Sequence, residues 1–219
     1  MSILLTGSSR GIGAAIHSAL TEAGATVIGH GTASGIPADF ADPTAPAALW
    51  NAALEQAGGV FEASLLEDDD WTAQWERTMR INLTASAELC RLAVLHWQAR
   101  GVGGRIVNIA SRAAYRGDSP AHWHYAASKA GMVAMTKTIA RGYAREGILA
   151  FAVCPGFTMT GMAEDYLSSR GGDALLADIP LGKVAEPAEV ASVARDCALE
   201  APASMTGAVI DVNGASYVR

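Results

Sequence analysis

A tyrosine and a lysine stand four residues apart at Tyr125 and Lys129. Four residues are about one turn of an α-helix, so a helix over this segment places the phenol and the ammonium on one face. A neighbouring ammonium favours the phenolate and therefore lowers the pKa of a tyrosine from its usual value of about 10. Such a tyrosine transfers protons near neutral pH as a general acid or base. The alternative interpretation is an ordinary pair on a solvated helix face.

Two further polar residues stand where they would assist a proton transfer. Ser111 follows the apolar run Arg105–Ile109, and ligands of open α/β sheets bind at the carboxyl ends of strands. There its hydroxyl would donate a hydrogen bond to a substrate carbonyl. Asn82 interrupts a helical pattern, and because asparagine is a poor helix-interior residue it indicates a kink or a held water. Taken singly, they are more commonly a loop serine and a locally capped asparagine.

A glycine-rich loop lies near the start of the chain, with the sequence Thr6-Gly-Ser-Ser-Arg-Gly-Ile-Gly13. It joins an apolar run to a helical pattern over residues 11–23. Its glycines permit a tight turn and the close approach of a ligand. The helix then directs its first N–H groups at that ligand, an arrangement that suits a pyrophosphate. No Gly-Lys-Ser/Thr follows, which excludes a Walker P-loop; the alternative is a glycine-rich turn without a ligand.

Short apolar runs alternate with amphipathic stretches along the whole chain. We expect strands at 3–6, 26–29, 36–40, 105–109, 148–153 and 209–212, and helices at 11–23, 46–57, 71–100, 125–146 and 187–199. Residues 155–186 are expected to form a loop region with short helices. No hairpin signal stands out, so the pattern predicts a single α/β domain over residues 1–219 with a mostly parallel sheet.

The composition excludes several classes of protein. Half of the 219 residues are hydrophobic, 17% are charged and the net charge is −6 without a basic run, so binding to nucleic acid is not expected. The three cysteines are far apart and form no CxxC pair, which argues against a zinc site or a disulfide framework and favours a reducing cytoplasm. No stretch predicts a signal peptide or a membrane span.

Together these motifs resemble one family, the short-chain dehydrogenases/reductases, and in particular its 3-oxoacyl-carrier-protein reductase-like members. The glycine loop is similar to TGxxxGxG, and the tyrosine and lysine are similar to YxxxK. Ser111 matches the serine after the family's fifth strand, and Asn82 the asparagine of its fourth helix. Asp39 resembles the aspartate that contacts the adenine, and Pro155-Gly-Phe-Thr158 resembles the PG motif, whose threonine binds the nicotinamide carboxamide. The resemblance implies a Rossmann-type doubly wound parallel sheet flanked by helices.

The resemblance also implies an activity: hydride transfer between NAD(P) and a small-molecule carbonyl or secondary alcohol. Tyr125 would exchange the proton, Lys129 would lower its pKa and hold the nicotinamide ribose, Ser111 would polarise the carbonyl and Asn82 would order a water. The residues expected at the cofactor are Gly7, Ser9, Arg10, Gly11, Ile12, Gly13, His30, Asp39, Tyr125, Lys129, Pro155, Gly156 and Thr158.

The sequence also predicts which cofactor is preferred and how many copies of the chain assemble. Enzymes that use NAD often carry an acidic residue at the end of the second strand, and the segment 27–32 has none. The charge of Arg10 would meet a 2′-phosphate, so we expect NADP(H) to be preferred, with NAD(H) as the alternative. The long helices expected at 71–100 and 125–146 are apolar on more than one face, which predicts a homotetramer or a homodimer. Residues 159–178 are the expected lid over the substrate, whose identity the sequence does not reveal.

The chain departs from the family at the fourth strand, because no NNAG motif is present and the stretch 31–35 is too short for the usual helix. A missing central strand leaves two edges unpaired, at about 1–3 kcal/mol for each buried unsatisfied group. Either Ala53–Val60 substitutes for the strand, or the natural polypeptide carries further residues just after Gly59 and near Gly35. We favour the second, because family-like sequence resumes cleanly at both glycines. The departure is also consistent with two alternative functions, a non-catalytic binding or regulatory protein and a structural subunit of a hetero-oligomer.

Overall fold

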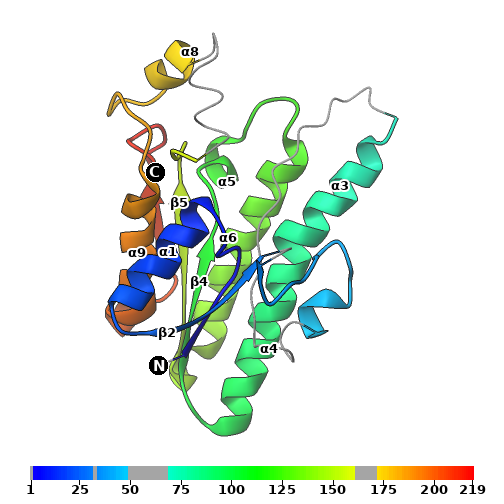
Figure 1. Ribbon diagram of the computed structural model, residues 1–219, viewed down its shortest axis with the longest axis vertical. Coiled ribbons are helices and arrows are strands. Elements are labelled where there is room, and N and C mark those ends of the chain that lie inside the picture. The colour runs from blue at the N-terminus through cyan, green and yellow to red at the C-terminus, as the bar shows by residue number, and fades with distance from the viewer. Residues whose placement is uncertain (1, 32–33, 49–68, 161–171) are drawn as a thin grey trace.

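A computed structural model describes residues 2–31, 34–48, 69–160 and 172–219 (Figure 1). Within these ranges strands and helices alternate along most of the chain. The strands are β1 (Ser2–Leu5), β2 (Thr26–Gly31), β3 (Ser34–Gly35), β4 (Gly104–Ile109), β5 (Ile148–Pro155) and β6 (Val209–Val212). The helices are α1 (Gly11–Glu22), α3 (Trp71–Met79), the π-helical turn η1 (Arg80–Thr84), α4 (Ala85–Arg100), α5 (Ala113–Arg116), α6 (Trp123–Tyr143), α8 (Gly172–Ala177) and α9 (Pro187–Leu199), with short 3₁₀ turns η2 (Ala144–Glu146) and η3 (Ala203–Met205).

Local sequence explains where the best-defined helices begin and end. Helix α9 begins at Pro187, whose missing N–H is not needed in a first turn, and a capping box links Glu186 and Glu189. Helix α4 ends at Gly101, which has a φ of 61° in the left-handed region that glycine tolerates. The helix expected at 71–100 runs without a break from α3 to α4. Around Asn82, however, it takes the π-helical form of η1.

The strands form two three-stranded sheets, ordered β1-β2-β3 and β4-β5-β6. Within them β1 pairs with β2, and β5 pairs with β4 and β6, all in parallel. Every residue of β5 is buried, as expected for the central strand of a sheet covered on both faces. The second sheet therefore provides a rigid platform, and the carboxyl ends of β4 and β5 point toward α5 and α8 in Figure 1.

The strand expected at 36–40 is wrong in position, because in this stretch the structure has an isolated parallel bridge of Ile36 with His30 in place of a strand. The structure instead has β3 at Ser34–Gly35, paired antiparallel to β2. Parallel neighbours need a crossover connection of a dozen or more residues, whereas only two residues separate β2 from β3. A hairpin is therefore the pairing that so short a connection permits, although no hairpin signal stands out in the sequence. In the region of the helix expected at 46–57, residues 45–48 are helical and the rest lies outside the described residues.

Helices cover both faces of the platform, as Figure 1 shows. On one face α1 and α9 pack in a cluster that takes side chains from β1 and from β4, including Leu5 and Ile109. On the other face α4 and α6 pack on β4 and β5 around Ile106 and Ile148. The fold is therefore the expected α/β architecture of parallel strands flanked by helices. In the described part of the chain, no helix is long and apolar enough to cross a membrane.

The described strands form two sheets that share no strand pairing. Strands β1 and β4 contribute to the same apolar cluster under α1 and α9, yet among the described residues no strand pairs with the second edge of either. This is the place where the sequence lacks the family's fourth strand. The candidate substitute, Ala53–Val60, lies outside the described residues.

Candidate active site

Tyr125 and Lys129 lie in the first two turns of α6, as their spacing predicts. Lys129 is buried, and its ammonium donates a hydrogen bond of 3.0 Å to the carbonyl oxygen of Ile109, the last residue of β4. The same ammonium lies 5.8 Å from the centre of the Tyr125 ring. The end of β4 therefore holds the lysine next to the tyrosine.

Ser111 joins this pair from the loop after β4. It is buried, and its side chain hydrogen-bonds that of Tyr125. The Ser111 hydroxyl oxygen also accepts a hydrogen bond of 3.1 Å from the backbone N–H of Ala113, where α5 begins. Helix α5 thus fixes the serine in the position from which it reaches the phenol.

Asn82 lies in the π-helical turn η1, a type of helix irregularity that is frequent at functional sites. Its side-chain amide donates to the hydroxyl of Ser128 at 3.2 Å, and that hydroxyl donates to the carbonyl oxygen of Tyr125 at 2.8 Å. Asn82 and Ser128 are fully buried. Sequence reasoning missed Ser128, although a residue three positions after Tyr125 on a helix lies near the same face.

The net pKa shifts of the pair differ from the sequence expectation. Burial raises the pKa of Tyr125, the hydrogen bond from Ser111 lowers it in part, and the negative charge of Asp118 raises it further. Burial also lowers the pKa of Lys129 to about 8. Removal of water disfavours both charged forms, so burial outweighs the effect of the ammonium on the phenol. The prediction that Lys129 lowers the pKa of Tyr125 does not describe the net shift in this structure.

The glycine loop has the backbone shape that its sequence predicts. Gly7 and Gly11 have φ values of 70° and 53°, in the left-handed region. A Cβ atom at Gly13 would lie 1.8 Å from the carbonyl oxygen of Gly7, so only glycine fits there. The loop is tied to β2 because the N–H and the hydroxyl of Ser8 both donate to the carbonyl oxygen of His30, each at 2.9 Å.

Three further residues of the loop differ in exposure. Ser9 and Arg10 are exposed, whereas Ile12 is half-buried and packs into the clusters around α1 and α9. The structure therefore places Ser9 and Arg10 where a bound molecule can reach them, and it places the Ile12 side chain in the core.

His30 and Asp39 lie at the end of β2 and beyond it. His30 is 2% exposed, its ring stacks on Phe40 with the centres 5.4 Å apart, and its Nε2 lies 3.1 Å from the carbonyl oxygen of Ala38. Burial lowers the pKa of His30, so its ring is neutral at pH 7. Asp39 is exposed, and one carboxylate oxygen accepts the N–H of Ala41 at 2.9 Å.

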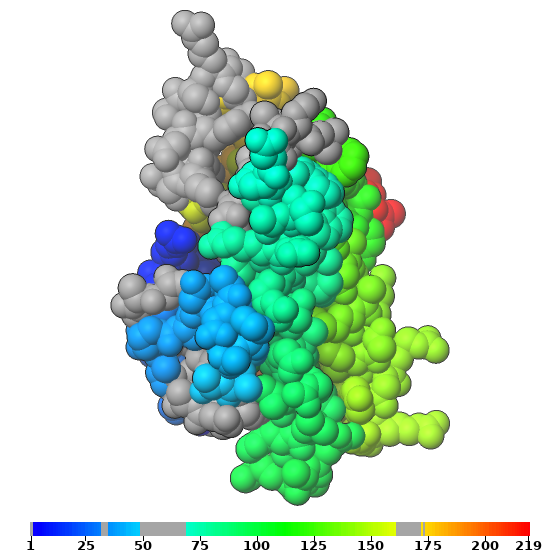
Figure 2. Space-filling view, turned by 90° about the vertical axis from the view of Figure 1, so that its right-hand side faces the viewer, coloured from blue at the N-terminus to red at the C-terminus, as the bar shows by residue number. Residues whose placement is uncertain are grey.

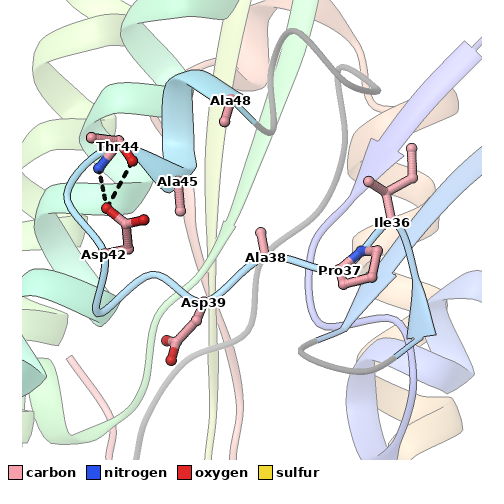
Figure 3. Close-up of a pocket in the computed structure, with 8 residues that line it drawn as sticks. All are labelled: Ile36, Pro37, Ala38, Asp39, Asp42, Thr44, Ala45 and Ala48. Atoms are coloured by element: carbon pink, nitrogen blue, oxygen red, sulfur yellow. Dashed lines mark hydrogen bonds between the residues drawn. The ribbon is translucent and has the colours of Figure 1, made fainter.

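Asp39 also lines a pocket of about 310 Å³ (Figure 3). Ala45 and Ala48 lie on one side of this pocket and Ile36 and Pro37 on the other. The remaining lining residues are Ala38, Asp42 and Thr44. The pocket is thus mostly apolar with carboxylates at its border, which suits a flat heterocycle that carries an amino group.

The Pro155–Thr158 segment leaves the end of β5. The N–H of Gly156 donates to Val212 at 2.9 Å, and a Cβ atom there would lie 2.8 Å from the Cα atom of Asn213, so glycine lets the chain pass close to β6. Thr158 is buried and forms an isolated β-bridge with Ala185.

The structure therefore gathers the expected residues into two neighbouring groups and a third region. Tyr125, Lys129, Ser111 and Asn82 are linked through hydrogen bonds and ring contacts at the carboxyl end of β4. The glycine loop meets the segment after Thr158, because a Cβ atom at Gly11 would lie 3.1 Å from the methyl group of Thr160. The third region, with His30 and Asp39, lies at the end of β2 on the first sheet.

A glycine-rich cradle at a helix N-terminus beside a Tyr–Lys–Ser site on a parallel α/β platform defines a class of protein, the nicotinamide-dependent oxidoreductases. The sequence model of a family described as enoyl-(acyl carrier protein) reductase matches residues 29–215. The chain belongs to this family, and with it to the short-chain dehydrogenases/reductases, and it is an oxidoreductase.

Curated relatives and solved structures resemble nearly the whole chain. The 3-oxoacyl-[acyl-carrier-protein] reductase FabG of Vibrio cholerae is 33% identical, over 98% of this chain and 96% of the relative. 3β-Hydroxysteroid dehydrogenase 1 of Eggerthella lenta is 30% identical, over 97% and 92%. A structure with bound NADP from Agrobacterium tumefaciens, described as a 2-deoxy-D-gluconate 3-dehydrogenase, is 26% identical with a TM-score of 0.91, covering 100% of this chain and 96% of that one.

A second solved structure with bound NADP is also similar to this chain. A Beutenbergia cavernae protein described as a gluconate 5-dehydrogenase is 27% identical with a TM-score of 0.87, covering 97% and 95% of the two chains.

The Vibrio cholerae alignment runs over 238 positions although this chain has 219 residues, so at least 19 positions of that relative face a gap here. Relatives of this length therefore contain residues that this sequence lacks.

Proposed function

We propose that this oxidoreductase interconverts a carbonyl and a secondary alcohol of a small-molecule substrate, with Tyr125 as the acid or base and NADP(H) as the preferred cofactor. The observation that carries the proposal is the position of the phenol. Ser111 hydrogen-bonds it and the Lys129 ammonium lies 5.8 Å from the centre of its ring.

In the reductive direction the Tyr125 phenol donates its proton to the substrate oxygen, which becomes the hydroxyl of the alcohol. The Ser111 hydroxyl polarises the same oxygen, and the positive charge of Lys129 stabilises the phenolate that the proton leaves behind. Asn82 orders a water beside this group, and the hydrogen bond from its side-chain amide to the Ser128 hydroxyl keeps η1 against α6. When bound, the nicotinamide cofactor supplies or accepts the hydride at the carbon atom.

The described residues fit a nicotinamide dinucleotide. The loop of Gly7, Gly11 and Gly13 makes its tight turn at the N-terminus of α1, where a pyrophosphate is favoured. Asp39 and its pocket suit the amino group and the flat ring of an adenine. The proposed cofactor residues are Gly7, Ser9, Arg10, Gly11, Ile12, Gly13, His30, Asp39, Tyr125, Lys129, Pro155, Gly156 and Thr158. In this set, His30 and Ile12 act through the loop and the core that they support.

Two features favour NADP(H) over NAD(H). Arg10 is exposed in the glycine loop, where its guanidinium would pair with a 2′-phosphate. The end of β2 carries no carboxylate to repel that phosphate, and His30 there is neutral at pH 7. Both solved structures described above contain NADP, which supports the same choice.

The relatives point to a type of reaction rather than to one substrate. Their names describe 3-oxoacyl groups, hydroxysteroids and gluconates, which share only a carbonyl or a hydroxyl group as the reacting centre. We therefore propose the reaction class and leave the remainder of the substrate open. The absence of an NNAG motif from the sequence favours one alternative function, a binding or regulatory protein that retains the fold without turnover.

We further propose that residues 1–219 form one domain and that the protein is a homotetramer or a homodimer. The continuous helix formed by α3, η1 and α4 lies beside α6 along one face of the molecule (Figure 2). On α4 and just after it, Leu95 and Val102 are 48% and 45% exposed, which favours contact with a second copy.

The decisive experiment compares the wild type with Tyr125→Phe, which removes one oxygen atom. NADPH binding is followed by nucleotide fluorescence, and turnover by NADPH oxidation with a panel of ketones. We expect the variant to bind NADPH and to lose about 10²–10⁴-fold in kcat. A variant that keeps more than about a tenth of the wild-type kcat contradicts the role of Tyr125. Binding without turnover by the wild type, for every ketone, would favour the alternative function.

A further inference from the structure

A cluster of three charged side chains connects the catalytic-serine loop to the end of α8. One carboxylate oxygen of Asp178 accepts hydrogen bonds from Arg112 at 3.2 Å and from Arg116 at 2.7 Å. Its second oxygen accepts another from Arg116 at 3.2 Å. Asp178 follows α8 directly, whereas Arg112 is the neighbour of Ser111 in sequence. Two arginines, at the start and at the end of α5, thus bind one carboxylate that follows α8.

Further contacts make the arginine side of this cluster rigid. The backbone N–H of Arg112 donates to Pro155 at 3.0 Å, and its guanidinium lies 5.8 Å from the centre of the Phe157 ring. Arg116 donates at 3.0 Å to the carbonyl oxygen of Ser216 in the C-terminal tail. The Arg112 side chain is 14% exposed. The two guanidiniums are therefore held in place from the end of β5 and from the tail.

The other side of the cluster belongs to the segment 172–185, whose last residue, Ala185, lies against the proposed nicotinamide residue Thr158. The β-bridge of Thr158 with Ala185 closes the base of this segment. Leu175 and Ile179 of the segment pack with Phe157 and Met159 in an apolar cluster. Asp178 lies between these two apolar residues in sequence. Apolar packing by itself specifies orientation poorly, because it has no directional contacts. The hydrogen-bonded ion pairs of Asp178 therefore fix the orientation of the packed segment.

We propose that Asp178 is a positioning residue, which docks the end of α8 onto the Ser111 loop through Arg112 and Arg116 and so sets the closure of the substrate side of the site. This inference rests on the proposed function for its effect on turnover. Its effect on docking is independent of any reaction. The hydrogen bonds from Arg116 and the positive charges of both arginines hold the pKa of Asp178 below its usual value, so the carboxylate is charged at pH 7.

The test uses Asp178→Asn, which keeps the shape and removes the charge, and Asp178→Glu, which keeps the charge. The matched control is Glu88→Gln on α4. The Glu88 side chain is 43% exposed and pairs with Arg91, while that of Asp178 is 42% exposed. Three quantities are measured for each protein: hydrogen exchange of the backbone amides at 172–179, the dissociation constant for NADPH, and kcat and KM for the ketone that the wild type reduces.

For Asp178→Asn we expect amide exchange at 172–179 to accelerate about fivefold, since exposed ion pairs contribute up to about a factor of five. We expect kcat/KM for the ketone to fall by a similar factor while NADPH binding is unchanged. Asp178→Glu should recover most of both effects, and Glu88→Gln should show neither. Unchanged exchange in Asp178→Asn would overturn the docking. Faster exchange with unchanged kcat/KM would overturn the positioning role. A wild type that reduces no ketone refutes the proposed function, and the exchange data still decide the docking.

Discussion

Replacement of Lys129 by methionine is expected to make the protein more stable while it removes activity. The lysine is buried at the end of β4, and burial lowers its pKa from 10.5 to about 8. At pH 7 the folded protein therefore holds a charge that its surroundings disfavour. Methionine has a similar length and no charge, so it occupies the same space without that cost.

The size of the effect follows from the pKa. Each pKa unit corresponds to about 1.36 kcal/mol, so the difference between 10.5 and about 8 corresponds to roughly 3 kcal/mol against the folded state at pH 7. The substitution also removes the hydrogen bond to the carbonyl oxygen of Ile109, at a cost of about 1 kcal/mol. The net gain in the free energy of unfolding is about 2 kcal/mol, which raises the Tm by about 4–8 °C for a chain of this size.

The pH dependence has a definite sign. The unfolded chain keeps the lysine proton up to pH 10.5, whereas the folded protein keeps it only up to about pH 8. The wild type therefore gains stability as the pH rises from 8 to 10.5, and the advantage of Lys129→Met shrinks across that window.

Thermal and urea unfolding of both proteins without added cofactor, at pH 7 and at pH 10, measure this difference. Lys137→Met, at an exposed lysine of the same helix, is the matched control and should change stability by less than about 0.5 kcal/mol. A Lys129→Met variant that is no more stable than the wild type at pH 7, or whose advantage is the same at pH 10, would refute the reasoning.

Three further predictions concern the cofactor, the assembly and the polypeptide itself. Arg10→Ala should reduce the preference for NADPH over NADH by about 10–150-fold in kcat/KM, as expected for a charge-assisted bond of about 1.5–3 kcal/mol; equal values for both cofactors in the wild type would contradict the proposal. Light scattering at micromolar concentration should give a dimer or a tetramer, and a strict monomer would contradict it. The intact mass of the natural protein should exceed 22.6 kDa, because relatives extend across gaps in this chain. A mass near 22.6 kDa, with every peptide bond between residues 31 and 60 confirmed, would exclude missing residues.

Much of the fold was predictable because its signals are local. The bounds expected for α9 and β6 agree with the structure at both ends, since Pro187 and short apolar runs act within a few residues. The type and spacing of Tyr125 and Lys129 likewise indicated the site, because a helix of any origin places residues four apart on one face. Ser111 and Asn82 became candidates through their positions, after an apolar run and inside a helical pattern, and the resemblance to a family then gave them roles.

Tertiary structure decided what depends on residues that are distant in sequence. The net pKa shift of Tyr125 is upward because the folded protein removes water from the phenol, which sequence spacing does not reveal. The third strand turned back as a hairpin because the connection to β2 has no room for a crossover. Arg112 and Asp178 are 66 residues apart and meet only when β5 brings the serine loop and the end of α8 together. Local patterns specify which elements form, whereas burial and long-range contacts arise only when those elements pack.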